Sequence, residues 1–249
     1  EATGLADNTS TAKNYVFTRD GNIWKIYQDG TQTRSGGPVF EDTLDSDSFT
    51  HTDSAKTSVS GGEFNWEIEL DSSDDTAFVK LPEVLEEQFV LRFDYTTDSI
   101  STTGNPGAFG KFVLSDSSSG QSASFDWIGF ERYISDASNT WNLGYGDNTS
   151  GNAATNGFST VPTGTSTYYM EIVRDGTTVT GKQYTASDFT GTPDTKTLTL
   201  SGTIDGLEYF KFYNRADNSN TGQTGVGSID NIRVWNGETT ASVSASHSV

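Results

Sequence analysis

The 249-residue chain contains no cysteine, so disulfide bonds and thiolate metal ligands are excluded. Cysteine usage therefore says nothing about the redox compartment. Histidine is nearly absent too, since the chain holds only His51 and His247, and neither lies in a catalytic-looking context. Zinc sites and nucleophilic triads consequently have no credible members in this sequence.

Positive charge is also scarce. Fifteen Lys and Arg residues oppose 34 Asp and Glu residues, which gives a formal net charge of −19. Such a chain repels phosphate backbones and anionic lipids, so the composition argues against nucleic-acid binding. No apolar run approaches the length of a membrane span, and no membrane insertion is predicted. Divalent cations and neutral ligands remain compatible with the charge, as does a purely solubilising role.

Aromatic residues make up a large share of the hydrophobic residues of the chain. Only 32% of the residues are hydrophobic, yet 12% are aromatic, with 15 Phe, 10 Tyr and 5 Trp. This balance is typical of a β-protein whose core is built from few, large side chains. No stretch sustains a helical period, although one helical turn is expected over residues 81–87, after Pro82.

Alternating runs predict the fold class. In residues 89–95 the apolar residues Phe89, Leu91 and Phe93 share one parity, while Arg92 and Asp94 take the other. Similar strands are predicted at 64–70, 109–114, 122–134, 196–200, 207–213 and 227–235, and residues 139–162 are predicted to be a long loop. About a dozen short strands predict an all-β protein, a two-sheet antiparallel β-sandwich of the jelly-roll type.

We divide the chain into an N-terminal arm at 1–38, a jelly-roll domain at 39–237 and a flexible tail or linker at 238–249. The arm holds a predicted β-hairpin at 14–30, because two aromatic-rich runs flank Asp20-Gly21. The Arg-Asp-Gly of residues 19–21 recurs at 174–176, which indicates either a sequence common to many hairpins or a partial repeat. Such a hairpin is unstable alone, so it must pack on this domain or on a neighbouring copy.

Two further features point outside the cell. The chain starts at Glu1 without a basic and apolar leader, which we interpret as a processed secreted protein or a segment of a longer one. Asn8 and Asn148 each begin a glycosylation sequon, a weak pattern that also arises by chance.

The closing Gly-Ser-Ile-Asp-Asn-Ile-Arg-Val-Trp at 227–235, the hairpin at 172–176 and Phe-Asp-Trp-Ile-Gly-Phe at 125–130 carry a resemblance. Over residues 39–237 the chain resembles a concanavalin A-like jelly roll of the laminin G-like type. That superfold holds lectins, carbohydrate-binding modules, adhesion domains, glucanases and polysaccharide lyases, and the fold does not choose among them.

The same resemblance implies a structural Ca²⁺. Many β-sandwich carbohydrate-binding modules share a calcium between Phe-Glu near the first strand and Ile-Asp on the last strand, which match Phe40-Glu41 and Ile229-Asp230 here. Asp42 and Asp45 lie close by in sequence and are added as candidate ligands. The alternative is a chance cluster among 34 acidic residues.

Glycan binding is predicted from an aromatic group near the middle of the chain. Sugars are bound by exposed rings that cover a pyranose face, with Asn, Asp and backbone amides on the hydroxyls. The candidate residues are Trp127, Tyr133, Trp141, Tyr145, Asp147 and Asn148. Core packing is the alternative explanation, and for Trp127 it is the preferred one.

Enzyme patterns match only partly. Glu67, Glu69 and Asp71 share a strand face, but their spacing departs from the Glu-x-Asp-x-x-Glu of laminarinase-like jelly rolls, so a solvated face explains them better. Tyr209-Phe210-Lys211 resembles a motif of jelly-roll alginate lyases, yet their Gln-x-His and Arg-rich strand are missing.

The first hypothesis is therefore an extracellular or cell-surface, non-catalytic module that binds a polysaccharide or cell-surface glycan in adhesion, with calcium as a stabiliser. The second is a structural subunit of an extracellular filament, surface layer or virion, in which identical subunits assemble through the N-terminal arm. A polysaccharide-degrading jelly-roll enzyme is the third and least favoured.

Overall fold

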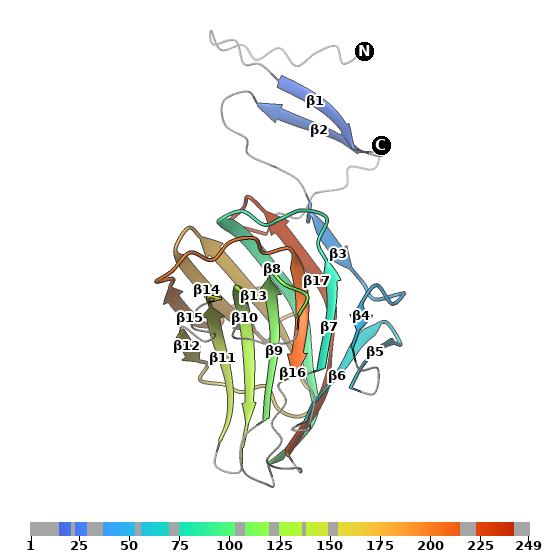
Figure 1. Cartoon of the computed structure of the whole chain (residues 1–249), viewed down its shortest axis with the longest axis vertical. Helices are drawn as coiled ribbons and strands as arrows, with labels where there is room; N and C mark the ends of the chain where they lie inside the picture. Colours follow the sequence, from blue (N-terminus) through green and yellow to red (C-terminus); the bar gives the residue numbers. More distant parts are fainter. Residues whose placement is uncertain are drawn as a thin grey trace. The chain divides into compact units, whose positions relative to one another are not determined.

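The computed structural model describes residues 15–20, 23–28, 37–52, 56–69, 75–102, 108–119, 125–135, 138–148, 154–214 and 223–241. The chain divides into two compact units, one of Glu1–Gly37 with Ser242–Val249 and one of Pro38–Ala241. Strands are the regular elements of all the described ranges (Figure 1). Within those ranges no helix is long and apolar enough to cross a membrane.

The first unit contains the predicted hairpin. Strand β1 (Tyr15–Asp20) pairs antiparallel with β2 (Ile23–Gln28), in a register that runs from Tyr15 opposite Gln28 to Asp20 opposite Ile23. Both strands of the hairpin predicted at 14–30 are therefore confirmed, while residues 14, 21–22 and 29–30 lie outside the described residues.

The second unit is a sandwich of two antiparallel sheets, as predicted (Figure 1). The seven-stranded sheet has the order β12 (Ala154–Gly157), β11 (Asn139–Gly146), β10 (Trp127–Ile134), β9 (Ala108–Ser115), β16 (Tyr209–Asn214), β7 (Asp75–Lys80) and β4 (Thr50–His51). The eight-stranded sheet has the order β15 (Asp194–Thr199), β14 (Thr178–Tyr184), β13 (Thr167–Asp175), β8 (Gln88–Thr102), β17 (Gln223–Asn236), β6 (Glu63–Glu69) and β5 (Thr57–Ser60), with β3 (Phe40–Asp42) also paired to β17.

The core lies between the two sheets and is largely aromatic. On β8, Phe89, Leu91 and Phe93 are fully buried, and the Phe93 ring packs against Phe112 and Phe130 of the opposite sheet. Each such side chain contributes roughly 1.5–3 kcal/mol of burial free energy. The predicted parity of this strand is therefore confirmed.

The helical turn expected at 81–87 is wrong. No helix forms there, because the chain bonds to a neighbouring segment instead. The Leu81 amide donates to the Glu208 carbonyl at 2.8 Å and the Leu85 amide to the Leu207 carbonyl at 2.9 Å. Both leucine side chains are buried, so packing outweighs the local preference.

The long loop expected at 139–162 is also wrong, since it contains β11 and β12. Trp141, Leu143 and Tyr145 alternate along β11 and all face the core. Gly144 lies between them on the outer face, where an added Cβ would approach Trp127 Cη2 to 2.9 Å. Gly144, one of the glycines that suggested a loop, therefore serves close packing within a sheet.

The closing strand β17 is central to its sheet. It pairs with β8 on one side and with β6 and β3 on the other. Its register against β8 shifts between Asp230 and Arg233, where Asn231 adopts a left-handed φ of 52°. This bulge changes the direction in which the side chains around Asp230 point.

Candidate functional site

The outer face of the eight-stranded sheet carries a polar pocket beside the β17 bulge. It is lined by Glu63, Asp94, Thr96, Thr167, Tyr169, Ser228, Ile229 and Asp230. Its volume of about 140 Å³ is well below the roughly 300–1,000 Å³ of closed small-molecule pockets. The pocket therefore suits a ligand that rests on the surface and inserts one group.

Strand alternation and register assemble this pocket. Tyr169 on β13 and Asp230 on β17 both lie opposite Asp94 on β8. One step along, Thr167 and Ser228 both lie opposite Thr96. Directly opposed residues of an antiparallel pair point to the same face about 4.5–5.5 Å apart. Two adjacent rows thus present a ring, two carboxyl groups and three hydroxyl groups.

The two carboxyl groups are coupled through the bulge. The side-chain amide of Asn231 donates to Asp94 Oδ2 at 2.9 Å and to Asp230 Oδ2 at 3.0 Å. Burial raises the pKa of Asp94, and the neighbouring Asp230 charge raises it further. Burial likewise raises the pKa of Asp230, as do Asp45 and Asp42. In their ionised form both groups only accept hydrogen bonds, so they favour a ligand that donates them.

Tyr169 is half-buried and is supported from one side. Phe189 packs against it at 6.0 Å between ring centroids, and the Arg92 guanidinium lies 4.2 Å from the Phe189 centroid. Glu171 beside them binds Arg92 Nη2 at 2.5 Å and Lys182 Nζ at 2.7 Å, so two cations balance its charge. This network holds the Tyr169 ring at the pocket edge.

The stacking roles predicted for Trp141 and Tyr145 are wrong, while for Trp127 the preferred explanation of core packing is confirmed. Trp127 and Trp141 are fully buried, and Tyr145 is 2% exposed. Trp141 stacks on Phe130 at 5.2 Å, and the Tyr145 hydroxyl bonds within the protein to Ser201 at 3.0 Å. Trp141 and Tyr145 point from β11 into the core, so neither of these two rings has a face left for a sugar.

The other predicted glycan residues lie away from the pocket. Tyr133 is half-buried on the outer face of the seven-stranded sheet and packs on Phe109 at 4.6 Å. Asp147 is half-buried, and exposed Asn148 donates its amide to Asp126 Oδ1 at 2.9 Å. Their roles in sugar binding remain predictions. Asn8 lies outside the described residues.

Three of the predicted calcium ligands, Glu41, Asp42 and Asp230, occupy the neighbouring strands β3 and β17, and Asp45 lies in the segment that follows β3. Glu41 Oε1 accepts from Arg233 Nε at 2.7 Å. Asp42 accepts from the Leu44 amide and the Ser48 hydroxyl, and Asp45 Oδ2 accepts from Thr43. Within the described ranges no group of three or more His, Cys, Asp or Glu residues could hold a metal ion. Calcium binding stays a prediction.

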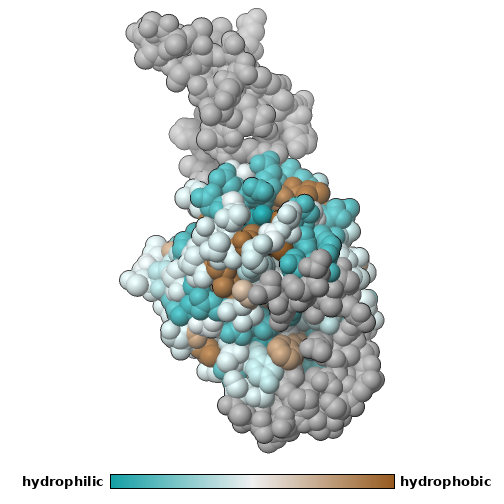
Figure 2. All heavy atoms as spheres, turned by 60° about the vertical axis from the view of Figure 1, so that its left-hand side comes forward, coloured by the Kyte–Doolittle hydropathy of each residue, from teal (hydrophilic) through white to brown (hydrophobic). Residues whose placement is uncertain are grey.

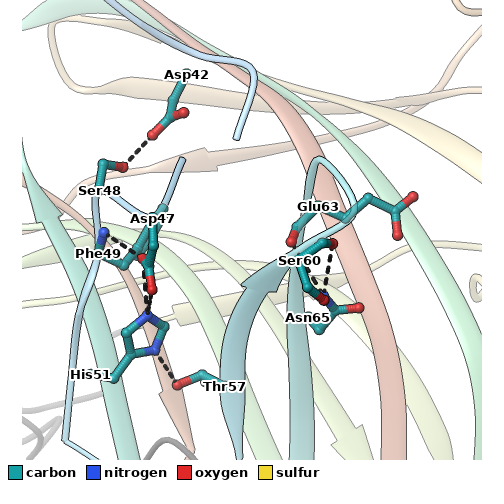
Figure 3. Close-up of polar contacts among 9 residues, drawn as sticks. All are labelled: Asp42, Asp47, Ser48, Phe49, His51, Thr57, Ser60, Glu63 and Asn65. Carbon is teal, nitrogen blue, oxygen red and sulfur yellow. Dashed lines mark hydrogen bonds and ion pairs between the residues drawn. The ribbon is translucent and has the colours of Figure 1, made fainter. Parts of the chain in front are cut away.

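His51 has a role that the sequence did not reveal. Its Nδ1 lies 2.6 Å from Thr57 Oγ1, and its Nε2 lies 3.1 Å from Asp47 Oδ2 (Figure 3). This order of groups matches a nucleophile–base–acid relay. However, Thr57 is only 3% exposed, which shields its hydroxyl from a substrate. The His51–Thr57 contact instead joins β4 of one sheet to β5 of the other, and Asp47 binds the imidazole from the segment before β4.

The same edge also positions one pocket residue. Asn65 donates its side-chain amide to Ser60 Oγ at 3.1 Å and to the Glu63 carbonyl at 3.2 Å. In Figure 3 the Glu63 carboxylate extends away from these bonds. The turn between β5 and β6 is thereby fixed with Glu63 projecting.

The enzyme-like patterns are engaged in structural contacts. Glu67 and Glu69 both pair with Lys56, while Asp71 lies outside the described residues. Lys211 is fully buried and donates to the Ser117 and Ser119 carbonyls at 2.8 and 2.9 Å.

Sequence reasoning missed most of the pocket, including Glu63, Asp94, Thr96, Thr167, Tyr169 and Ser228. The outward parity of Asp94 was readable from its strand. What brings it beside Tyr169 and Asp230 is strand register, which a single sequence does not give.

No protein-family model and no curated protein matches the chain. Solved structures do. The carbohydrate recognition domain of Emp47p superposes with a TM-score of 0.52 at 10% identity, over 80% of this chain and 96% of that one. The CBM2 module of the evolved Dit of Lactobacillus casei BL23 phage J-1 gives 0.50 at 11% identity, over 80% and 95%. Peanut lectin gives 0.50 at 10% identity, over 79% and 97%. The fold is the concanavalin A-like jelly roll that the sequence resembled.

Proposed function

We propose that this protein is a non-catalytic glycan-binding module that receives a sugar at the pocket on the outer face of the eight-stranded sheet. The observation that carries the proposal is the pairing of the Tyr169 ring with two rows of carboxyl and hydroxyl groups on an open sheet face. Similarity to a carbohydrate recognition domain and a CBM2 module supports the same kind of partner.

The chemistry of the pocket fits a neutral sugar. Tyr169 offers an apolar surface to a pyranose, while Asp94 and Asp230 accept hydrogen bonds from its hydroxyls. Thr96 and Ser228 can donate as well as accept. Three acidic residues line the pocket and the chain carries a net charge of −19, so a polyuronate is disfavoured.

The protein surface supports a soluble module that meets its ligand at a polar site. In Figure 2 the coloured part of this face is mostly teal or pale, and its hydrophobic residues form small groups among them. We propose an extracellular or cell-surface setting and an adhesive use together with glycan binding, because polysaccharides and cell-surface glycans are the ligands in question.

Glycan-array screening of the full chain tests this function, followed by titration of the best ligand. Tyr169→Ala should weaken binding at least about tenfold, which corresponds to losing about 1.4 kcal/mol of contact. Tyr133→Ala is the matched control, because that half-buried tyrosine lies on the other sheet. Thermal melting of both variants verifies folding.

Two outcomes would contradict the proposal. A folded protein that binds no glycan on the array would remove the function itself. Loss of binding in Tyr133→Ala but not in Tyr169→Ala would place the site on the seven-stranded sheet instead.

A second candidate is a structural subunit of an extracellular filament, surface layer or virion. The observation in its favour is the β1–β2 hairpin, which belongs to a separate unit and forms a two-stranded sheet in the described residues. Two-stranded hairpins are marginal alone, and adding strands to another subunit is an established form of recognition. Electron microscopy and sedimentation should show polymers for the full chain and monomers after deletion of residues 1–37. A monomeric full chain would refute this candidate.

A further inference from the structure

The interior of the sandwich contains an arginine without a counterion. Arg132 on β10 shares its parity with the core residues Phe130 and Ile134, and none of its surface is exposed. Its Nη1 donates to the Pro162 carbonyl at 2.8 Å. Its Nε and Nη2 have no hydrogen-bond partner in the described part of the chain. An unpaired buried charge costs several kcal/mol.

Other arginines in this protein do have acidic neighbours. Arg92 binds Glu171 and Arg233 binds Glu41. For Arg132, burial lowers the pKa, and the group that opposes this effect is the hydroxyl of Tyr95 rather than a carboxylate. The positive charge of Arg132 is therefore not balanced by any described side chain.

Further unpaired donors lie next to this guanidinium. Trp141 is the direct cross-strand neighbour of Arg132, and its Nε1 is buried without a partner. Its ring packs on Tyr95 at 4.6 Å, and the buried Tyr95 hydroxyl lies beside Thr97 without a well-formed hydrogen bond in the described part of the chain. Trp66 stacks on Tyr95 at 5.5 Å and contributes another unpaired Nε1. Guanidinium and indole groups only donate, so donors predominate in the cluster. The oxygens beside it, the Tyr95 hydroxyl and Asn139 Oδ1 on the same face of β11, are neutral and cannot balance the charge.

We propose that this cluster binds a small monovalent anion of halide size between the two sheets. Arg132 Nε and Nη2 and Trp141 Nε1 would be its donors, with the Tyr95 hydroxyl beside them. A water molecule accepts two hydrogen bonds and carries no charge, whereas an anion accepts several and neutralises the guanidinium. The site is independent of the glycan pocket, which lies on the opposite face of β8.

Thermal melting of the full chain in sodium bromide and in sodium gluconate, at equal ionic strength, tests the proposal. Above the dissociation constant, each tenfold rise in bromide should raise the wild-type Tm by about 3–6 °C more than gluconate does. Arg132→Met should lose this bromide-specific slope. Arg233→Met, which removes a partly exposed arginine, should keep it.

A second variant and a direct observation cover the case in which Arg132→Met does not fold. Trp141→Phe removes one donor and keeps a large ring, so it should shift the bromide response to higher concentration. Bromide-soaked crystals should show an anomalous peak between Arg132 and Trp141. Equal slopes in both salts for wild type, or no such peak, would overturn the proposal.

Discussion

Replacing Lys211 with methionine should stabilise this protein at neutral pH. The Lys211 side chain is fully buried on the outer side of β16, where its Nζ lies 3.3 Å from the centroid of the Phe125 ring. Burial lowers the pKa of Lys211 from 10.5 to about 7, against the opposing effect of Asp116 and with a smaller contribution from Lys111. Carrying this charge in the folded state is therefore unfavourable.

The size of the effect follows from the pKa. A value of about 7 in place of 10.5 corresponds to a cost of up to about 5 kcal/mol for the charged form. Methionine removes that cost but also removes the hydrogen bonds to the Ser117 and Ser119 carbonyls. Ser119 is exposed and Ser117 half-buried, so water can replace part of this loss. We expect a net gain of about 2 kcal/mol, or about 4–8 °C in Tm.

The pH dependence gives a sharper signature. Between about pH 7 and pH 10.5 the unfolded chain keeps a proton on Lys211 that the folded chain has released. Wild-type stability should therefore rise with pH in this window, and the full penalty should remain below pH 7. The gap in Tm between Lys211→Met and wild type should be constant below pH 7 and shrink towards pH 10.

Thermal denaturation followed by circular dichroism from pH 5 to pH 10 measures this gap. Lys80→Met is the matched control, because Lys80 lies on the same sheet with a side chain that is 61% exposed. The control should change Tm little at any pH. A lower Tm for Lys211→Met with no dependence on pH would refute the reasoning, since it would mean that the carbonyls and the ring fully compensate the charge.

Three further tests address the glycan pocket, the β17 contact and calcium. Burial raises the pKa of Asp94, so the stability of the wild type should fall as pH rises through that raised pKa. Asp94→Asn carries no such charge and should melt at a higher temperature than wild type at pH 7. The two Tm values should converge near pH 3, where Asp94 is protonated in both the folded and the unfolded chain. Gly227→Ala should lower the free energy of unfolding, measured in urea, by about 3 kcal/mol. The added Cβ would lie 2.1 Å from the Thr96 carbonyl oxygen and 2.5 Å from Trp66 Cζ2. The control Gly202→Ala should lower it little. If calcium binds near Asp230, EDTA should lower the Tm of wild type but not of Asp230→Asn, and an unchanged wild-type Tm would end that hypothesis.

The strands of this fold were predictable where apolar residues alternate without interruption. Phe89 to Tyr95 comes close to this pattern, because its inward residues Phe89, Leu91, Phe93 and Tyr95 are buried, while Val90 is a buried exception on the outer face. Trp141 to Tyr145 alternates in the same way, but the surrounding Gly and Asn suggested a loop. The prediction there followed the composition and not the short alternating pattern. The glycan-binding hypothesis for Trp141 depended on that loop and is wrong for the same reason.

The site was less predictable, because it depends on which strands become neighbours. Asp94 and Asp230 are far apart in sequence and meet only through the register of β8 with β17. Arg132 did carry a local signal, since it occupies an inward position between Phe130 and Ile134. A charged residue at such a position marks a buried polar group whatever the partner is.

The central place of β17 has a consequence for how the chain is made. A ribosome releases β6 and β8 well before the strand that must lie between them. Until β17 emerges, both strands expose open edges that invite pairing with other nascent chains. Its contact with β3 spans 192 residues, from Glu41 to Arg233. The eight-stranded sheet can therefore be completed only after nearly all of the domain has been synthesised. This order of synthesis favours slow folding and dependence on chaperones.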